Sequence, residues 1–387
     1  MFANRTHWNL TPNRLSTALA RHRAARKPLL DLTVSNPTEC GFSYGQGMIL
    51  DALRNPAALH YEPVARGLIA ARQAVAAYYA EHACAVHTDD IFLVTSTSEA
   101  YSYVFRLLCN PGDEILIPAP GYPLFDFLAD LQDVKLMRYP LLYDHGWQID
   151  FSWFEKAIAP RTRAAIVVHP NNPTGHYAKP QEQVQLSAIS AKHNLALISD
   201  EVFLDFSMQG APANSFVSQT SSLTFSLSGI SKLCGLPQMK SAWIALSGPE
   251  KHKNDSRQRL EVIADSYLSM NAPVQLTLPV LLATRTQFQS QLLSRVRANL
   301  SFLDREIAKQ NACSRLAFDA GWNVVLRVPA TRSDEDLALS LLERQGVLVH
   351  PGHFYDFSQD GFLVLSLIVP EKEFAEGVHG LLSFLSS

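Results

Sequence analysis

The 387-residue sequence is poor in several features, and each shortage argues against a class of protein. Its five cysteines, Cys40, Cys84, Cys109, Cys234 and Cys313, are odd in number and widely spaced, with no CxxC pair. That pattern disfavours a disulfide framework and a zinc site, so we expect no metal and a reducing compartment. No run approaches the roughly 18 apolar residues of a membrane span, and the start does not resemble a signal peptide. The sequence therefore predicts a cytoplasmic protein.

The sequence also lacks an excess of charge of one sign. Its 33 Lys and Arg residues against 36 Asp and Glu residues give a formal net charge of -3. This balance gives no electrostatic support for binding nucleic acid or a membrane surface. The hydrophobic share of 47% is typical of a soluble globular enzyme, and the length suffices for a large and a smaller domain.

Short apolar runs, rich in β-branched residues, recur through the first two-thirds of the chain, at 91–94, 114–118, 164–168, 195–199, 223–227 and 242–246. Segments with helical periodicity separate most of them, which predicts a mostly parallel sheet with helices on both faces. We expect an α/β domain over residues 46–275 and a smaller α+β domain formed by residues 1–45 and 276–387. The active site of such a sheet lies beyond the carboxyl ends of its strands.

Polar clusters follow these runs in a characteristic order: HPNNPTG, then SDEVF, then SGISKLCGLPQMK. The ordered set resembles the pyridoxal-phosphate-dependent aminotransferases of class I/II, which have the aspartate-aminotransferase fold, or fold type I. The resemblance covers nearly the whole chain, because motifs from Tyr61 to His350 follow in family order at family-like spacing. It implies the cofactor pyridoxal 5′-phosphate and a homodimer with sites built from both chains.

Two residues carry the chemistry that this resemblance implies. Lys232 lies in an apolar stretch, where desolvation lowers the pKa of a lysine and leaves the neutral amine that attacks an aldehyde. The resemblance makes Lys232 the Schiff-base lysine and the base that moves the α-proton. Asp200 ends an apolar run, where a carboxylate is often only a helix cap. The resemblance pairs Asp200 with the pyridinium nitrogen, which a buried carboxylate keeps protonated.

The cofactor phosphate requires backbone amides at a helix start together with hydroxyl and cationic side chains. Ser96, Thr97 and Ser98 resemble the phosphate loop of the family, with Ser96 in place of the usual glycine, and they also suit a helix cap. The resemblance adds Ser228 and Lys240. Lys240 stands where the family has arginine, so we expect a weaker or differently angled contact.

Three further residues complete the predicted cofactor site. The resemblance assigns Asn172 to the 3′-oxygen of the ring, Tyr122 to stacking on the ring, and Tyr61 to the phosphate of the neighbouring subunit. Asn172 also suits a simple turn, and Tyr122 suits a core position. Phe203 replaces the usual tyrosine that donates to the 3′-oxygen, so that hydrogen bond is missing.

The substrate side departs from the family pattern. Val364 stands where the family has the arginine that binds the substrate α-carboxylate. Valine cannot make that pair, in which each charged hydrogen bond contributes about 1.5–3 kcal/mol. Either another cation replaces it (Arg327, Arg66 or Lys240, in that order), or the substrate is an amine or carries its carboxylate elsewhere. The candidate substrate residues are Asn36, Arg327 and Trp322.

Transamination between an amino donor and a keto acid is the leading hypothesis. Lys232, Asp200 and Asn172 suit a lyase, such as a carbon–sulfur β-lyase, or a decarboxylase equally well, because the cofactor does the hard chemistry. A regulatory cofactor-binding protein is disfavoured by the lack of a basic patch, and a nicotinamide dehydrogenase by the lack of a G-x-G-x-x-G motif.

Overall fold

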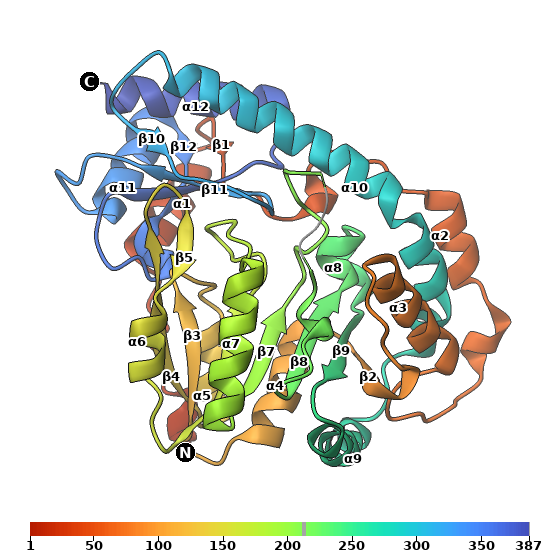
Figure 1. Ribbon diagram of the computed structural model, residues 1–387. Helices are drawn as coiled ribbons and strands as arrows, with labels where there is room; N and C mark the ends of the chain where they lie inside the picture. The colour runs from red at the N-terminus through yellow and green to blue at the C-terminus, as the bar shows by residue number, and fades with distance from the viewer. Residues whose placement is uncertain (211–213, 387) are drawn as a thin grey trace.

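The computed structural model describes residues 1–210 and 214–386. A large sheet with its helices forms one part of the molecule, and elements from both ends of the chain form another part beside it (Figure 1). The strands are β1 (Leu30–Asp31), β2 (Ile91–Val94), β3 (Glu114–Ala119), β4 (Lys135–Tyr143), β5 (Trp147–Ile149), β6 (Thr162–Val168), β7 (Ala196–Asp200), β8 (Thr224–Gly229), β9 (Ala242–Ser247), β10 (Ser314–Arg315), β11 (Asn323–Arg327), β12 (Val347–Leu348), β13 (His350–Pro351) and β14 (Phe362–Ser366). The α-helices are α1 (Arg14–Ala24), α2 (Gln46–Leu53), α3 (Ile69–Glu81), α4 (Thr97–Leu108), α5 (Phe125–Asp130), α6 (Phe151–Lys156), α7 (Pro180–His193), α8 (Ile230–Leu233), α9 (Glu250–Tyr267), α10 (Ala272–Ile307), α11 (Asp334–Gln345) and α12 (Glu371–Leu385).

The large sheet has eight strands in the order β2-β9-β8-β7-β6-β3-β4-β5. The pairs β8/β7, β7/β6, β6/β3 and β3/β4 are parallel, whereas β9 and β5 run antiparallel to their neighbours. The central strands are buried along their whole length, as expected for a sheet covered by helices on both faces. The predicted mostly parallel sheet is therefore confirmed.

The sequence pattern located six strands of this sheet but not β4 and β5. Residues of β4 alternate between partly exposed and buried, so they do not form the continuous apolar run that marks a central strand. A strand at or near the edge of a sheet buries less of its surface, which is the physical reason for its weak signal.

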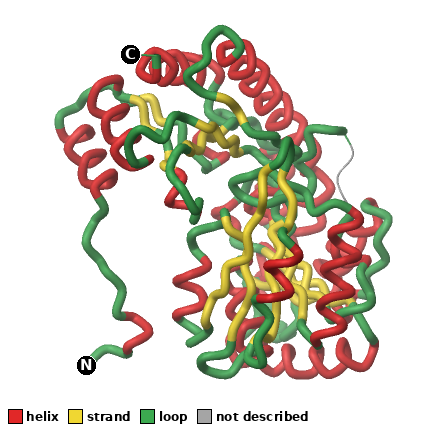
Figure 2. The backbone as a smooth tube through the Cα atoms, turned by 60° about the vertical axis from the view of Figure 1, so that its left-hand side comes forward, coloured by secondary structure: helices red, strands yellow, loops and turns green. Residues whose placement is uncertain are grey.

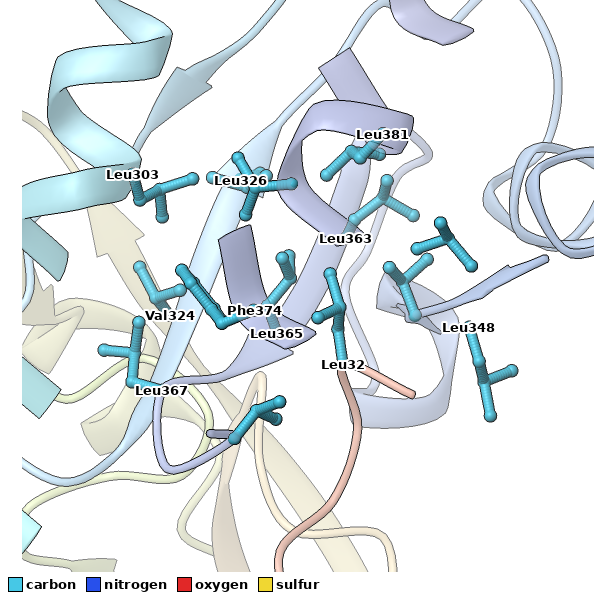
Figure 3. Close-up of a cluster of buried hydrophobic side chains, with 14 of the residues drawn as sticks. Leu32, Leu303, Val324, Leu326, Leu348, Leu363, Leu365, Leu367, Phe374 and Leu381 are labelled. Carbon is cyan, nitrogen blue, oxygen red and sulfur yellow. The ribbon is translucent and has the colours of Figure 1, made fainter. Parts of the chain in front are cut away.

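The second part contains the antiparallel sheet β10-β11-β14-β13 and the parallel pair β1-β12. Its core lies between β11, β14 and α12, and Figure 3 shows Val324, Leu326, Leu363 and Leu365 meeting Phe374 there. Leu32, from the N-terminal segment, is fully buried in the same cluster. The two ends of the chain thus share one core.

Helix α10 joins the two parts, because it packs on α2 and α3 near its start and on α12 near its end. Figure 2 shows the first residues of the chain as an extended arm leading away from α1. The indole nitrogen of Trp8 on this arm donates to Asp130 at the end of α5, over 2.8 Å. Within residues 1–210 and 214–386, no helix is long and apolar enough to cross a bilayer.

Candidate active site

A cavity of about 390 Å³ lies at the carboxyl ends of β6, β7 and β8 and is closed by residues of the antiparallel sheet and the N-terminal segment. Nine of the residues predicted from sequence line it: Ser96, Thr97, Ser98, Tyr122, Asn172, Asp200, Lys232, Lys240 and Trp322. A second hollow of about 300 Å³ lies at the opposite ends of the strands, around Arg163 and Asn194, and contains none of them. The first cavity is therefore the candidate active site.

Lys232 lies in the short helix α8, which directly follows β8 at the end of the strand that reaches the cavity. Its Nζ lies 5.0 Å from the ring centroid of Trp322 and 5.8 Å from that of Phe203. Burial among these rings lowers the pKa of Lys232 to about 8, although the charge of Asp200 acts in the opposite direction. A substantial neutral fraction of this amine is thus available near neutral pH.

Asp200 is the last residue of β7, and its side chain is only 8% exposed. Its Oδ1 accepts from the backbone N–H of Val202 over 3.2 Å, and its Oδ2 accepts from the hydroxyl of Tyr101 over 2.8 Å. Burial raises the pKa of Asp200, and these two hydrogen bonds and the charge of Lys232 limit the rise. Sequence reasoning missed Tyr101, which lies on the buried face of α4 and gives no sign of its distant partner.

The start of α4 forms the polar end of the cavity. Ser96 is the N-cap, and its Oγ accepts from the backbone N–H of Glu99 over 3.2 Å. The Glu99 carboxylate turns back to accept from the backbone N–H of Thr95 over 2.6 Å. The amides of Thr97 and Ser98 belong to the first helical turn, whose N–H groups have no carbonyl partner within the helix. This end of the cavity is suited to an anion.

Lys240 lines the same cavity from the turn after α8, in a left-handed conformation with φ of 52°. Ser228 does not line it, because its Oγ points to the carbonyl oxygen of Glu201 at 3.5 Å. Ser231 lines the cavity instead, one residue before Lys232. Sequence reasoning missed it, although its position directly before the lysine was a usable signal.

Asn172 is held by an amide–amide hydrogen bond from the antiparallel sheet. The Nδ2 of Asn323 donates to the Oδ1 of Asn172 over 2.7 Å. This bond occupies the amide oxygen of Asn172 and leaves its Nδ2 hydrogens for a ligand. Tyr122 faces the same cavity with 42% of its surface exposed.

Besides Ser228, three predicted residues lie away from the cavity. Tyr61 is 69% exposed and lies beside Asn271 at the start of α10. Asn36 caps a short helix by accepting from the backbone N–H of Thr38 over 3.2 Å. Arg327 is exposed at the end of β11, over the rings of Tyr143 and Phe362.

The position of the missing arginine is apolar and closed. Val364 is 2% exposed in the core around Phe362 and does not line the cavity. Of the three candidate replacement cations, Arg66 forms an ion pair with Glu261 over 2.5 Å, and Arg327 lies outside the cavity. Only Lys240 lines it. His350 and Tyr355, which sequence reasoning did not assign, line the wall nearest to Val364.

The donor set fits pyridoxal 5′-phosphate. The first turn of α4 and Lys240 provide amide, hydroxyl and ammonium donors for a phosphate. Asp200 provides a buried carboxylate for a ring N–H, and Lys232 provides an amine whose pKa burial lowers to about 8, suited to an aldehyde. One end of the cavity therefore suits the phosphate of this cofactor, and the other end suits its ring nitrogen and aldehyde.

Comparisons with known proteins agree with this donor set. The family model "Aminotransferase class I and II" matches residues 50–381. The glutamate-pyruvate aminotransferase AlaA of Escherichia coli K12 is 31% identical over 250 residues, covering 64% of this chain and 62% of that enzyme, which is less than two thirds of its length. An alanine aminotransferase of Mycobacterium bovis is 27% identical over 379 residues, covering 95% of this chain and 88% of that enzyme.

Solved structures show the same fold. An aminotransferase from Escherichia coli has a TM-score of 0.90 at 24% identity, covering 100% of this chain and 98% of that one. An alanine aminotransferase from Pyrococcus furiosus also has a TM-score of 0.90, at 19% identity, with 100% of both chains covered. The predicted fold type I architecture is confirmed by these likenesses.

Proposed function

The chain belongs to the class I and II aminotransferase family, whose members use pyridoxal 5′-phosphate, and we propose that it transfers an amino group from an amino donor to a keto acid. The observation that carries this proposal is the joint presence of Lys232 and Asp200 in one cavity, each with a pKa shifted by burial. Titratable groups with shifted pKa values in a cleft are typical of catalytic sites.

Each part of the cofactor has a proposed set of holding residues. Lys232 would hold the aldehyde carbon through Nζ, and Asp200 would hold the ring nitrogen. Asn172 would donate to the 3′-oxygen, and Tyr122 would cover the ring. The phosphate would be held by Ser96, Thr97, Ser98, Ser231 and Lys240 and by Tyr61 of the neighbouring subunit. When bound, the cofactor supplies an electron sink for bonds at the substrate α-carbon.

Proton transfer is carried out by side chains of the protein. In this proposal Lys232 Nζ is the base that removes the α-proton, and its neutral form is favoured by the rings of Trp322 and Phe203. Asp200 would face the ring nitrogen, and the hydroxyl of Tyr101 and the N–H of Val202 stabilise its carboxylate charge against burial, which raises its pKa. Phe203 offers no hydroxyl to the 3′-oxygen, which leaves that contact to Asn172.

The first test is the absorbance of the purified holoenzyme between 300 and 500 nm. We expect a band that is lost in Lys232→Ala, together with a loss of at least about a thousandfold in activity, because nucleophile and base are removed together. Lys251→Ala, which removes an exposed lysine of α9, is the matched control and should leave both unchanged. A Lys232→Ala protein that keeps the band would overturn the assignment.

A product assay distinguishes transamination from elimination or decarboxylation. Transamination requires a keto-acid acceptor and follows ping-pong kinetics, whereas a lyase releases pyruvate or thiol from one substrate without an acceptor. We expect turnover to depend on the keto acid. Product formation without any acceptor would favour the lyase instead.

A further inference from the structure

The wall of the cavity nearest to the missing arginine contains a histidine. In the antiparallel pair of β13 with β14, His350 lies directly opposite Val364. Side chains of directly opposed residues lie on the same face of a sheet, close together. Val364 ends in the core, whereas the longer His350 side chain reaches the cavity. The imidazole of His350 therefore lies next to Val364, the position at which the family has its arginine.

His350 forms a pair with Tyr355, which lies at the end of the short helix after β13. The Nδ1 of His350 lies 2.9 Å from the hydroxyl of Tyr355, and both side chains line the cavity. Tyr355 is only 7% exposed, and its carbonyl oxygen accepts from the N–H of Gly121 in the loop that carries Tyr122. The pair is therefore fixed relative to the proposed cofactor site.

The pair retains one free proton whichever tautomer it adopts. If the Tyr355 hydroxyl donates to Nδ1, the ring proton of His350 is on Nε2 and is free. If Nδ1–H donates to Tyr355 instead, the hydroxyl proton is free. In both cases a neutral pair presents one hydrogen-bond donor to a ligand.

The other charged groups of this region are already engaged. Lys232 and Lys240 are the lysines of the cavity wall among the described residues, and the proposed function uses both for the cofactor. Asp31, whose charge acts on His350, accepts from the hydroxyl of Thr33 over 2.6 Å and lies 3.9 Å from Arg23. His350 and Tyr355 are thus available for the substrate.

Resting on the proposed function, we propose that the His350–Tyr355 pair binds the α-carboxylate of an amino-acid substrate in place of the family arginine. The carboxylate is then held by a neutral donor rather than by a bidentate guanidinium. The substrates are therefore α-amino acids, and the pair discriminates them from amines that lack the carboxylate.

The test compares L-alanine with ethylamine, which differs from it only in lacking the carboxylate. For each, the rate of the first half-reaction is followed by the absorbance of the holoenzyme. In the double variant His350→Leu/Tyr355→Phe we expect kcat/KM for L-alanine to fall about tenfold to hundredfold, the effect of losing one charged hydrogen bond, while the ethylamine rate is unchanged. The single variants show which residue carries the free proton.

Tyr143→Phe is the matched control, since it also removes a tyrosine hydroxyl, but one that contacts Ala317 outside this cavity. A structural defect would lower both rates equally, and an equal loss or no loss in the double variant would overturn the inference. A wild-type enzyme that reacts with ethylamine at least as well as with L-alanine would also overturn the inference. The proposal of transamination would not be affected by that result. Absence of the cofactor band would instead overturn the proposed function.

Binding without turnover gives an independent measurement. Propionate has a carboxylate but no amino group, so it occupies the carboxylate site without reacting. We expect its Kd for the holoenzyme, measured by calorimetry, to rise about tenfold in Tyr355→Phe or His350→Leu, whichever removes the free donor. An unchanged Kd in both variants and in the double variant would contradict the proposal.

Discussion

Lys232 and Asp200 illustrate how one environment shifts two residues in opposite directions. Both lose water at the ends of buried strands, and burial disfavours the charged form of each. The pKa of Lys232 therefore falls, to about 8, whereas that of Asp200 rises. Their opposite charges partly restore ionisation in both.

Tyr101 should tune Asp200 without contacting the substrate. Tyr101→Phe removes the 2.8 Å hydrogen bond that stabilises the Asp200 carboxylate, so the pKa of Asp200 rises further. The ionised form, which the ring nitrogen needs, then becomes less populated at acid pH. We expect kcat to fall about tenfold and the acid limb of the kcat–pH profile to move to higher pH. Tyr143→Phe, which removes a hydroxyl that contacts Ala317 outside the cavity, is the control, and a profile with an unmoved acid limb would refute the role.

At the scale of elements, a buried polar network ties α3 to α10. Asp205 accepts from His82 Nε2 over 2.9 Å, from Tyr78 over 2.9 Å and from Gln289 over 2.8 Å. Arg285 of α10 lies 3.6 Å from Asp205 and also pairs with Glu81. The network therefore anchors α10, which also packs on α12, to α3 and to the loop after β7.

The network should make stability depend on pH in both directions. Burial is the largest single influence on His82 and opposes its charge, but the hydrogen bond to Asp205, the negative charge of Asp205 and the bond to the carbonyl oxygen of Tyr78 together raise its pKa above 6.5. Its contribution is thus complete below 6.5 and is lost as pH rises through the raised pKa. Burial is also the largest single influence on Asp205 and opposes its charge, but the hydrogen bond and charge of His82 and the hydrogen bonds from Gln289 and Tyr78 together lower its pKa below 3.8. That contribution is lost as pH falls through the lowered pKa.

Asp205→Asn should therefore destabilise the protein most between these limits. Breaking a buried charged pair costs about 3–5 kcal/mol, and we expect the loss to be larger at pH 5 than at pH 9. Urea denaturation at both pH values measures it. Asp144→Asn removes an exposed Asp–His pair and should change stability by less than about 1 kcal/mol. Equal losses at both pH values would contradict the role of His82.

At the scale of the whole molecule, the cavity requires three separate parts of the chain. The large sheet provides Lys232 and Asp200, the N-terminal segment provides Thr33, and the antiparallel sheet provides Asn323 and His350. A division into residues 46–275 and residues 1–45 with 276–387 remains our proposal for the domain boundary. Whatever the boundary, the site lies between parts that are distant in sequence.

We also propose a homodimer in which Tyr61 completes the neighbouring site. The exposed Tyr61 does not reach the cavity of its own chain. Lys232→Ala and Tyr61→Ala should each be strongly impaired, but a hybrid dimer purified with two different tags retains one intact site. We expect it to recover about half of the wild-type activity. A hybrid as inactive as its parents, or a monomeric wild type in light scattering, would exclude a shared site.

The sequence by itself determined six of the eight strands of the large sheet and the polar residues that follow them. Continuous apolar runs identify strands that are covered on both faces. In β7 and β8 every residue is buried, so apolar and polar side chains do not alternate along the strand. Parallel strands bring their carboxyl ends to one edge, so Asp200 and Lys232 were predictable as neighbours from their places in the chain. The N-cap at Ser96 follows from local chemistry alone.

Only the tertiary structure decided which side chains reach the cavity from far along the chain. Arg327 lies on the same face of β11 as Asn323, which lines the cavity, but it stands at the other end of the strand, over the rings of Tyr143 and Phe362. Ser228 and Ser231 are three residues apart, yet only Ser231 lines the cavity, because the chain changes from strand to helix between them. Tyr101 meets Asp200, 99 residues further along the chain, only because α4 packs on the large sheet, and the local pair His350–Tyr355 reaches the cavity only because β13 pairs with β14. The pattern of residues within one segment does not predict such contacts.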